Sequence, residues 1–424
     1  MTARDKIILR LVVAWCAIAT TLSVSHFALA TSETHKSGAE ASVFGQAYVQ
    51  GPRGEELLTI DWATGAVVSR SSLGAHPESS AGGTLPKPGL RVARAASAST
   101  TVFNKKVYVL VYDPLLSNGK KLSAQLNWND HAVLTQGTID FFRQASNNRL
   151  NYTVVYTTVV TGGWPEKIDG FQYTEAQYLA VINNQMQPHS PDTVDYVKII
   201  NTPAFDICGK VNRGEIDELW IYNGPYFGFY ESQLVGPNAY WYNSPPITSG
   251  TACNRLLPVM GPSPEVALPN AVHNFGHRAE ATMTRVYGSW QQNRTAHNWE
   301  RFALVDALSP NYSYSGCGNI HFPPNATQDY EYGRSASTNS NCDDFANYPN
   351  LSDPATTAHP VACSAWGCND FRYYDYWFSH LPSTAGCASD GFASDWWKYF
   401  ADPLLAVDAT FPCRVRVFLP FVMR

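Results

Sequence analysis

The sequence has few charged residues and no long apolar run, and each of these absences excludes a class of protein. Only 15% of its 424 residues are Asp, Glu, Lys or Arg, and no cluster of Lys and Arg interrupts the chain. Neutralising the phosphates of a nucleic acid requires such a cluster, so we expect no nucleic-acid partner. The longest apolar run, residues 11–24, has about 14 residues. A membrane-spanning helix needs roughly 20 apolar residues, so we do not expect this chain to be an integral membrane protein.

Two common catalytic signatures are also missing. The chain contains no glycine-rich nucleotide-binding loop and no G-x-S-x-G elbow. Their absence disfavours nucleotide chemistry and the usual α/β serine hydrolases.

The N-terminal 30 residues have the three parts of a secretory signal peptide. Basic residues precede the apolar run, and Ala28-Leu29-Ala30 follows it with small residues at its first and third places. We predict cleavage after Ala30 and a secreted, extracellular protein. Residues 413–424 form a short apolar tail, which is either a signal for cell-surface association or a last edge strand.

Eight cysteines remain after residue 30, and all of them lie beyond residue 207. An even number of cysteines in an oxidising compartment predicts up to four disulfide bonds, and the sequence leaves their pairing open. The cysteines are Cys208, Cys253, Cys317, Cys342, Cys363, Cys368, Cys387 and Cys413.

The pattern of the chain changes near residue 102. Residues 31–101 are rich in Ala, Ser and Gly and predict a low-complexity spacer or propeptide with a linker, in which 43–49 and 57–62 could pair as one hairpin. Beyond it, expected strands alternate with expected helices, which predicts an α/β domain over 102–412, with α+β as the alternative. The strands are at 107–112, 150–160, 196–200 and 216–222, and the helices at 132–146 and 175–184.

The most informative helix is expected at Pro269–Tyr287, because Pro suits its first turn and Gly288 suits its C-terminal end. His273 and His277 are four residues apart, and Glu280 follows three residues later. All three side chains therefore lie on one face, where two imidazoles can take neighbouring corners of a tetrahedral zinc site.

The segment His273-Asn274-Phe275-Gly276-His277 resembles the H-E-x-G-H helix of zincin metallopeptidases. The resemblance implies a zincin-like domain with a mixed sheet, an active-site helix and hydrolysis of peptide bonds. In that family the residue after the first His is a Glu that takes a proton from zinc-bound water. Asn274 stands there in this chain and cannot accept the proton, so the resemblance fits either a peptidase with another base or a relative that binds metal without turnover.

Three residues are candidates for the third metal ligand. Glu300 begins an expected second helix, similar to the gluzincin arrangement; Glu280 could bind the metal or act as the base; and His321 could reach in from a cysteine-bounded loop. The alternative without a metal is that both helix histidines pack against aromatic loops.

A second function class remains open. The acids of 215–218 lie at a strand end, where paired carboxylates could hydrolyse glycosides, and Tyr226, Phe227 and Tyr230 offer aromatic faces for a sugar or an extended peptide. The sequence therefore predicts a secreted metallopeptidase-like zinc protein, with a glycan-binding or glycan-hydrolysing protein as the alternative and a purely structural surface protein as the third hypothesis. The acids of 329–332 and 341–344 add a candidate Ca²⁺ site, although their spacing matches no calcium loop.

Overall fold

The computed structural model describes residues 101–290, 295–309, 312–408 and Cys413, together with the backbone of three strands nearer the N-terminus. The predicted signal peptide, most of the predicted linker and residues 414–424 lie outside the described residues. No helix of the described part is long and apolar enough to cross a membrane.

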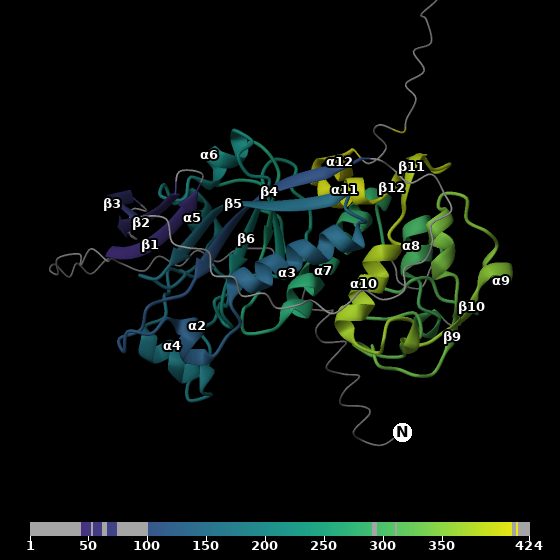
Figure 1. Cartoon of the computed structure of the whole chain (residues 1–424), viewed down its shortest axis with the longest axis horizontal. Helices are drawn as coiled ribbons and strands as arrows, with labels where there is room; N and C mark the ends of the chain where they lie inside the picture. The colour runs from purple at the N-terminus through teal and green to yellow at the C-terminus, as the bar shows by residue number, and fades with distance from the viewer. Residues whose placement is uncertain are drawn as a thin grey trace, which may run out of the picture. The chain divides into compact units, whose positions relative to one another are not determined.

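A mixed sheet organises the described residues (Figure 1). Its strand order is β3-β2-β1-β5-β4-β6-β8-β7. Strands β5, β4, β6 and β8 run parallel, and β7 is antiparallel to β8. This sheet, with helices between its parallel strands, confirms the predicted α/β class. The five strands beyond residue 100 are β4 (Phe103–Tyr112), β5 (Leu150–Val160), β6 (Glu218–Tyr222), β7 (Ser232–Val235) and β8 (Leu257–Met260).

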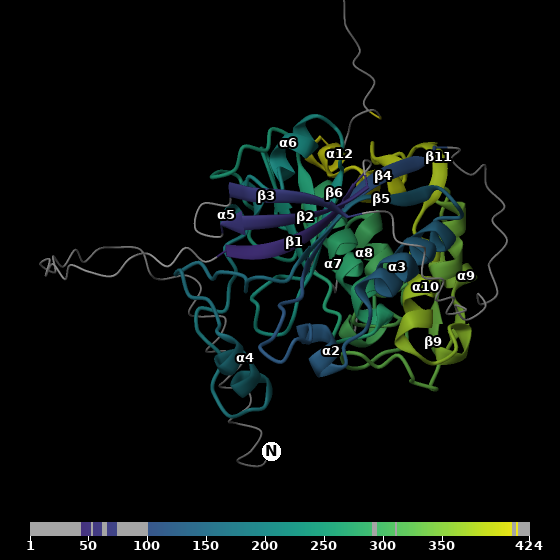
Figure 2. The ribbon, with the colours of Figure 1, turned by 60° about the vertical axis from the view of Figure 1, so that its left-hand side comes forward.

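The sheet extends into the segment that we expected to be a low-complexity spacer. Strands β1 (Phe44–Gly51) and β2 (Gly54–Asp61) form the predicted hairpin, and β3 (Ala66–Leu73) pairs with β2. Strand β1 pairs in turn with β5, so all three strands belong to the same sheet (Figure 2). The sheet therefore does not begin at the expected boundary near residue 102.

Both faces of the sheet are buried, because alternate side chains of β4 enter two different apolar clusters. Val107, Val109 and Val111 point to one cluster, and Tyr108 and Leu110 to the other. The result is a three-layer arrangement. The first face is covered by α3 (His131–Ala145), α7 (Leu268–Tyr287), α10 (Asp370–His380) and α11 (Trp397–Ala401), and the second by α2 (Leu122–Leu126), α4 (Glu175–Ile182), α5 (Tyr196–Asn201) and α6 (Ile207–Asn212).

The strand expected at 196–200 is wrong, because these residues form helix α5. The Asp195 side chain accepts a hydrogen bond from the Lys198 amide, which is the geometry of a helix N-cap. Tyr196, Ile199 and Ile200 then fall on one buried helical face. A short apolar run does not by itself distinguish a buried strand from a buried helical turn.

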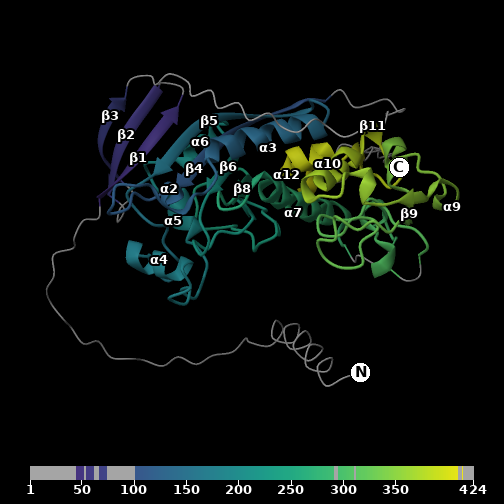
Figure 3. The same ribbon diagram turned by 60° about the horizontal axis from the view of Figure 1, so that its bottom comes forward.

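Beyond α7 the chain consists of short elements joined by long loops (Figure 3). Four disulfides confirm the prediction of a cross-linked second half: Cys208–Cys253, Cys317–Cys342, Cys363–Cys368 and Cys387–Cys413. The elements are α8 (Asn298–Ala303), η1 (Asp306–Leu308), β9 (Thr338–Ser340), η2 (Cys342–Asn347), α9 (Pro354–Thr357), β10 (His359–Val361), η3 (Cys363–Ala365), β11 (Ser383–Cys387), β12 (Ala393–Asp395) and α12 (Pro403–Val407).

A buried ion pair fixes α7 to the sheet. The Arg278 guanidinium donates to both carboxylate oxygens of Glu218 on β6, at 2.7 and 2.8 Å, and also to the Phe400 carbonyl. Glu218 is only 1% exposed and Arg278 is fully buried. Because Arg278 follows His277 directly, this pair sets the depth and rotation of the helix that carries both histidines.

Removal of one partner of this pair is expected to destabilise the fold strongly. The variant Glu218→Ala leaves the Arg278 charge buried and unpaired, which costs about 3–5 kcal/mol. Chemical denaturation measures the loss of unfolding free energy. The double variant Glu218→Leu/Arg278→Met is the control. It removes both charges but also leaves the Tyr152 hydroxyl and the Trp220 indole N–H without their acceptor, so it should recover part of that loss. Equal instability of the two variants would contradict a charge-based explanation.

Candidate metal centre

Helix α7 has the termini that the sequence predicted. Pro269 lies in its first turn, and Gly288 ends it with a φ of 83°, a left-handed conformation that favours glycine. Gly276, within the helix, provides space for a neighbouring side chain. A Cβ atom at that position would lie 2.3 Å from Cδ1 of Ile320, so only glycine lets the loop that contains Ile320 pack directly on the helix.

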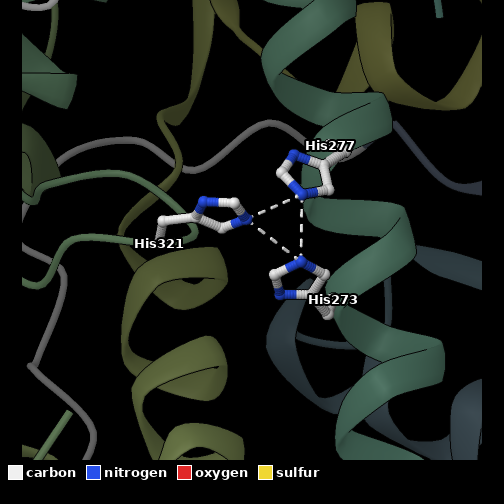
Figure 4. Close-up of side chains that lie close together, drawn as sticks. All are labelled: His273, His277 and His321. Carbon is white, nitrogen blue, oxygen red and sulfur yellow. Dashed lines mark hydrogen bonds between the residues drawn. The ribbon is translucent and has the colours of Figure 1, made fainter. Parts of the chain in front are cut away.

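Three histidine side chains converge at this contact between helix and loop (Figure 4). His273 and His277 come from α7, and His321 comes from the loop immediately after Ile320. The Nε2 atoms are 2.9 Å apart for His273 and His277, 3.1 Å for His277 and His321, and 3.3 Å for His273 and His321. Nitrogen ligands at about 2.05 Å from a tetrahedral zinc ion would be about 3.3 Å apart. The cluster could therefore hold a metal ion.

Each histidine also has an oxygen partner for its other ring nitrogen. His273 Nδ1 is 3.1 Å from the Tyr374 hydroxyl, His277 Nδ1 is 2.9 Å from Glu280 Oε2, and His321 Nδ1 is 3.4 Å from Asp329 Oδ1. Carboxylate partners require an Nδ1–H group, and the Tyr374 hydroxyl can accept one because it donates its own proton to Tyr332. The three Nε2 atoms then present lone pairs to one another. Such oxygen partners are typical of the outer shell of histidine metal sites.

Hydrogen bonds and a disulfide hold the loop that supplies His321. The Asn319 side chain accepts from the backbone amides of His321 and Phe322, and Glu280 Oε1 accepts from the Ile320 amide at 2.8 Å. The disulfide Cys317–Cys342 fixes the start of the loop. Glu280 therefore links helix, loop and His277 through one carboxylate.

The electrostatic environment favours neutral imidazoles at two of the three positions. Burial, with the neighbouring His277 and His321, lowers the pKa of His273 to about 3. Burial and His277 likewise lower the pKa of His321. Burial also acts against the charged form of His277, but the hydrogen bond to Glu280 and the negative charges of Glu280 and Glu231 outweigh it and raise its pKa. A metal ion requires deprotonated ligand nitrogens, so His273 and His321 are already in the binding form near neutral pH.

Two further polar groups face the histidines, and the sequence reasoning assigned neither of them to the site. Glu231 precedes β7, and its carboxylate oxygens are 3.6 Å from His277 Nε2 and 4.0 Å from His273 Nε2. Asn243 Nδ2 donates to Glu231 Oε2 at 2.6 Å and orients the carboxylate. The Tyr330 hydroxyl is 3.1 Å from His321 Nε2, and its side chain is 56% exposed.

Of the three candidates for the third ligand, the structure brings His321 to the helix histidines. Glu280 contacts His277 through Nδ1, on the side away from the cluster. Glu300 is buried on α8, where it accepts from the Ala296 amide and lies 3.9 Å from His297. Glu300 is not part of the cluster. Asn274, at the position of the zincin glutamate, donates to the Gly261 carbonyl instead.

The aromatic segment before β7 is divided between core and surface. Phe227 is fully buried and packs on Trp164 and Tyr178, so in this fold it cannot contact a substrate. Tyr226 is partly exposed, and Tyr230 stacks on Tyr196.

The acids proposed for other sites have structural partners. Glu218 is paired with Arg278, and Glu215 with Arg213. Asp343, from the candidate calcium cluster, contacts His380 and His359. Within the described residues, the histidine triad is the one group of three or more His, Cys, Asp or Glu residues close enough to hold a metal ion.

Comparison with known proteins gives no relative. No protein-family model matches the chain, and neither the curated proteins nor the solved structures contain a significant match.

Proposed function

We propose that the protein is a secreted, zincin-like hydrolase that binds one Zn²⁺ through His273, His277 and His321 and cleaves a peptide-type amide bond. The observation that carries this proposal is the convergence of three Nε2 atoms whose Nδ1 atoms already have oxygen partners. The four disulfides and the signal-like N-terminal segment support export.

Zinc is the metal that the donor set favours. Three imidazole nitrogens with near-tetrahedral spacing match the protein ligands of catalytic zinc sites, which leave one position open. A zinc ion bound there would lower the pKa of a coordinated water and polarise a carbonyl group. Hard cations such as Ca²⁺ prefer oxygen ligands instead.

Glu231 is the proposed general base, in place of the glutamate that Asn274 replaces. Its carboxylate oxygens lie 3.6 Å from His277 Nε2 and 4.0 Å from His273 Nε2. Asn243 holds one oxygen, which leaves the other able to accept a proton.

Tyr330 is the proposed donor to the oxygen that gains negative charge during amide hydrolysis. Its hydroxyl lies beside His321 Nε2, and its ring contacts the His321 ring at a centroid distance of 4.5 Å. Tyr330 has a φ of 61°, a conformation that is costly for a residue with a bulky side chain and is concentrated at functional sites. A donor placed in this way stabilises charge that develops only in the transition state.

The proposal is tested by metal content and by hydrolysis together. Protein obtained by secretion and exchanged into metal-free buffer is expected to retain about one zinc per chain in elemental mass spectrometry. A fluorogenic peptide library should then be cleaved by the zinc-loaded protein and not after removal of zinc with a chelator. Folded protein that takes up no zinc would contradict the metal site, whereas zinc binding without cleavage of any peptide would contradict only the hydrolase.

A further inference from the structure

A pocket of about 440 Å³ opens directly beside the histidine triad. His277 and Glu280 belong to its lining, and Tyr240, Trp241 and Trp290 add aromatic side chains to it. A substrate whose scissile bond lies at the triad would extend into this pocket, since the two spaces share His277. The following inference rests on the proposed function, because it names the substrate class of that same site.

The pocket contains a cation that has no carboxylate partner among the described residues. Arg285 lines the pocket, and its guanidinium lies over the Tyr240 ring at 5.8 Å from the centroid. The acid in the lining, Glu280, has its oxygens occupied by His277 Nδ1 and the Ile320 amide. Among the residues that the structure describes, the pocket therefore offers a positive charge without a carboxylate partner.

The aromatic walls add an apolar platform beside this charge. Trp241 is 58% exposed although it is a large apolar side chain, and it lies in the pocket wall. Trp290 adds a second indole side chain to the lining. The guanidinium donors of Arg285 next to an exposed ring fit a ligand with acceptor oxygens and a flat or apolar body.

The neighbouring strand edge does not offer an alternative place for a long extended substrate. Peptides often bind by adding a strand to an exposed sheet edge, and β7 is the last strand of the sheet. Its outer edge is already paired: the Gly236 amide donates to the Ile247 carbonyl, and the Ile247 amide donates to the Leu234 carbonyl. The chain itself therefore occupies that edge, and recognition falls to the side chains of the pocket.

We propose that this pocket binds a carboxylate of the substrate, with Arg285 as its charge partner and Trp241 as the surface for the adjoining group. Arg285 is eight residues beyond His277 on α7, a rise of about 12 Å, and its side chain leans back toward the helix N-terminus. Two to three extended residues span about 7–11 Å. The carboxylate is thus a free C-terminus or an acidic side chain two to three residues from the cleaved bond.

The first test measures binding of small probes to zinc-loaded protein by saturation-transfer NMR and titration. Hippurate is compared with its neutral amide for the C-terminal source, and N-benzoylglutamate amide with N-benzoylglutamine amide for the side-chain source. We expect about a tenfold preference for the charged member of at least one pair, as a charge-assisted hydrogen bond provides. Arg285→Gln should abolish this preference, whereas Arg301→Gln, which removes an exposed arginine outside the pocket, should preserve it.

The zinc-free protein separates this inference from the proposed function. A preference for the charged probes that persists without zinc and depends on Arg285 supports carboxylate binding in the pocket, even if no peptide is cleaved. Equal binding of charged and neutral probes, or a preference unchanged in Arg285→Gln, would overturn it. Preference for phenyl glucuronide over phenyl glucoside, with none for the amino-acid probes, would assign the carboxylate to a sugar and also overturn the peptide-type inference.

Discussion

Replacement of His321 by alanine is expected to weaken zinc binding by at least about 100-fold while the protein remains folded. Loss of an outer hydrogen-bond partner alone typically weakens metal binding 10–100-fold, and His321 supplies one of the three converging nitrogens. At zinc concentrations of about 1,000 times the dissociation constant, the wild-type protein gains about 4 kcal/mol of stability. A 100-fold weaker variant gains about 1.4 kcal/mol under the same conditions.

Thermal unfolding with and without zinc measures this difference, and competition with a chromogenic chelator gives the affinity directly. His359→Ala is the matched control, because His359 is exposed and contacts Asp343 outside the triad. Loss of zinc affinity in both variants, or in neither, would contradict the assignment of His321 as the third ligand.

Glu231→Gln is expected to separate catalysis from metal binding. The amide preserves the size of the side chain and can still contact Asn243, but it cannot accept a proton. If Glu231 is the base, kcat should fall by about 10²–10⁴-fold with zinc content unchanged.

The measurement combines elemental analysis with steady-state kinetics on a peptide that the wild-type protein cleaves. Glu265→Gln, which removes an exposed acid outside the triad, is the control and should retain full activity. Zinc lost together with activity would instead make Glu231 a fourth ligand. Activity retained in Glu231→Gln would leave the base to another group.

The sequence predicted helix α7 well because all the information for it is local. Pro269, Gly288 and the four-residue spacing of His273 and His277 are contained in one segment. The local sequence could not decide which of Glu300, Glu280 and His321 joins the two helix histidines. The outcome depended on Gly276, which admits Ile320 to the helix surface, and on the disulfide at Cys317, neither of which has a periodic signature.

Glu231 could not have been assigned to the site from its own segment. It lies 42 residues before His273 and reaches the triad because β7 is next to β8, the strand that leads into α7. Strand pairing of this kind joins distant segments, and the hydrophobic pattern alone does not specify it. The same reason explains β1–β3, whose place in the sheet depends on pairing with β5.

Residues 242–247, which pair with the outer edge of β7, also affect whether copies of the molecule can associate through that edge. An unpaired edge strand is a template on which another chain can add, and long, apolar edges lead to aggregation. Here the Ser232 hydroxyl donates to the Tyr242 carbonyl, and the Ser244 hydroxyl donates to the Ser232 carbonyl. The Gln233 side-chain amide donates to the Pro245 carbonyl. All four residues of β7 are buried, so the segment that limits substrate binding at this edge also protects the edge from growth of the sheet between molecules.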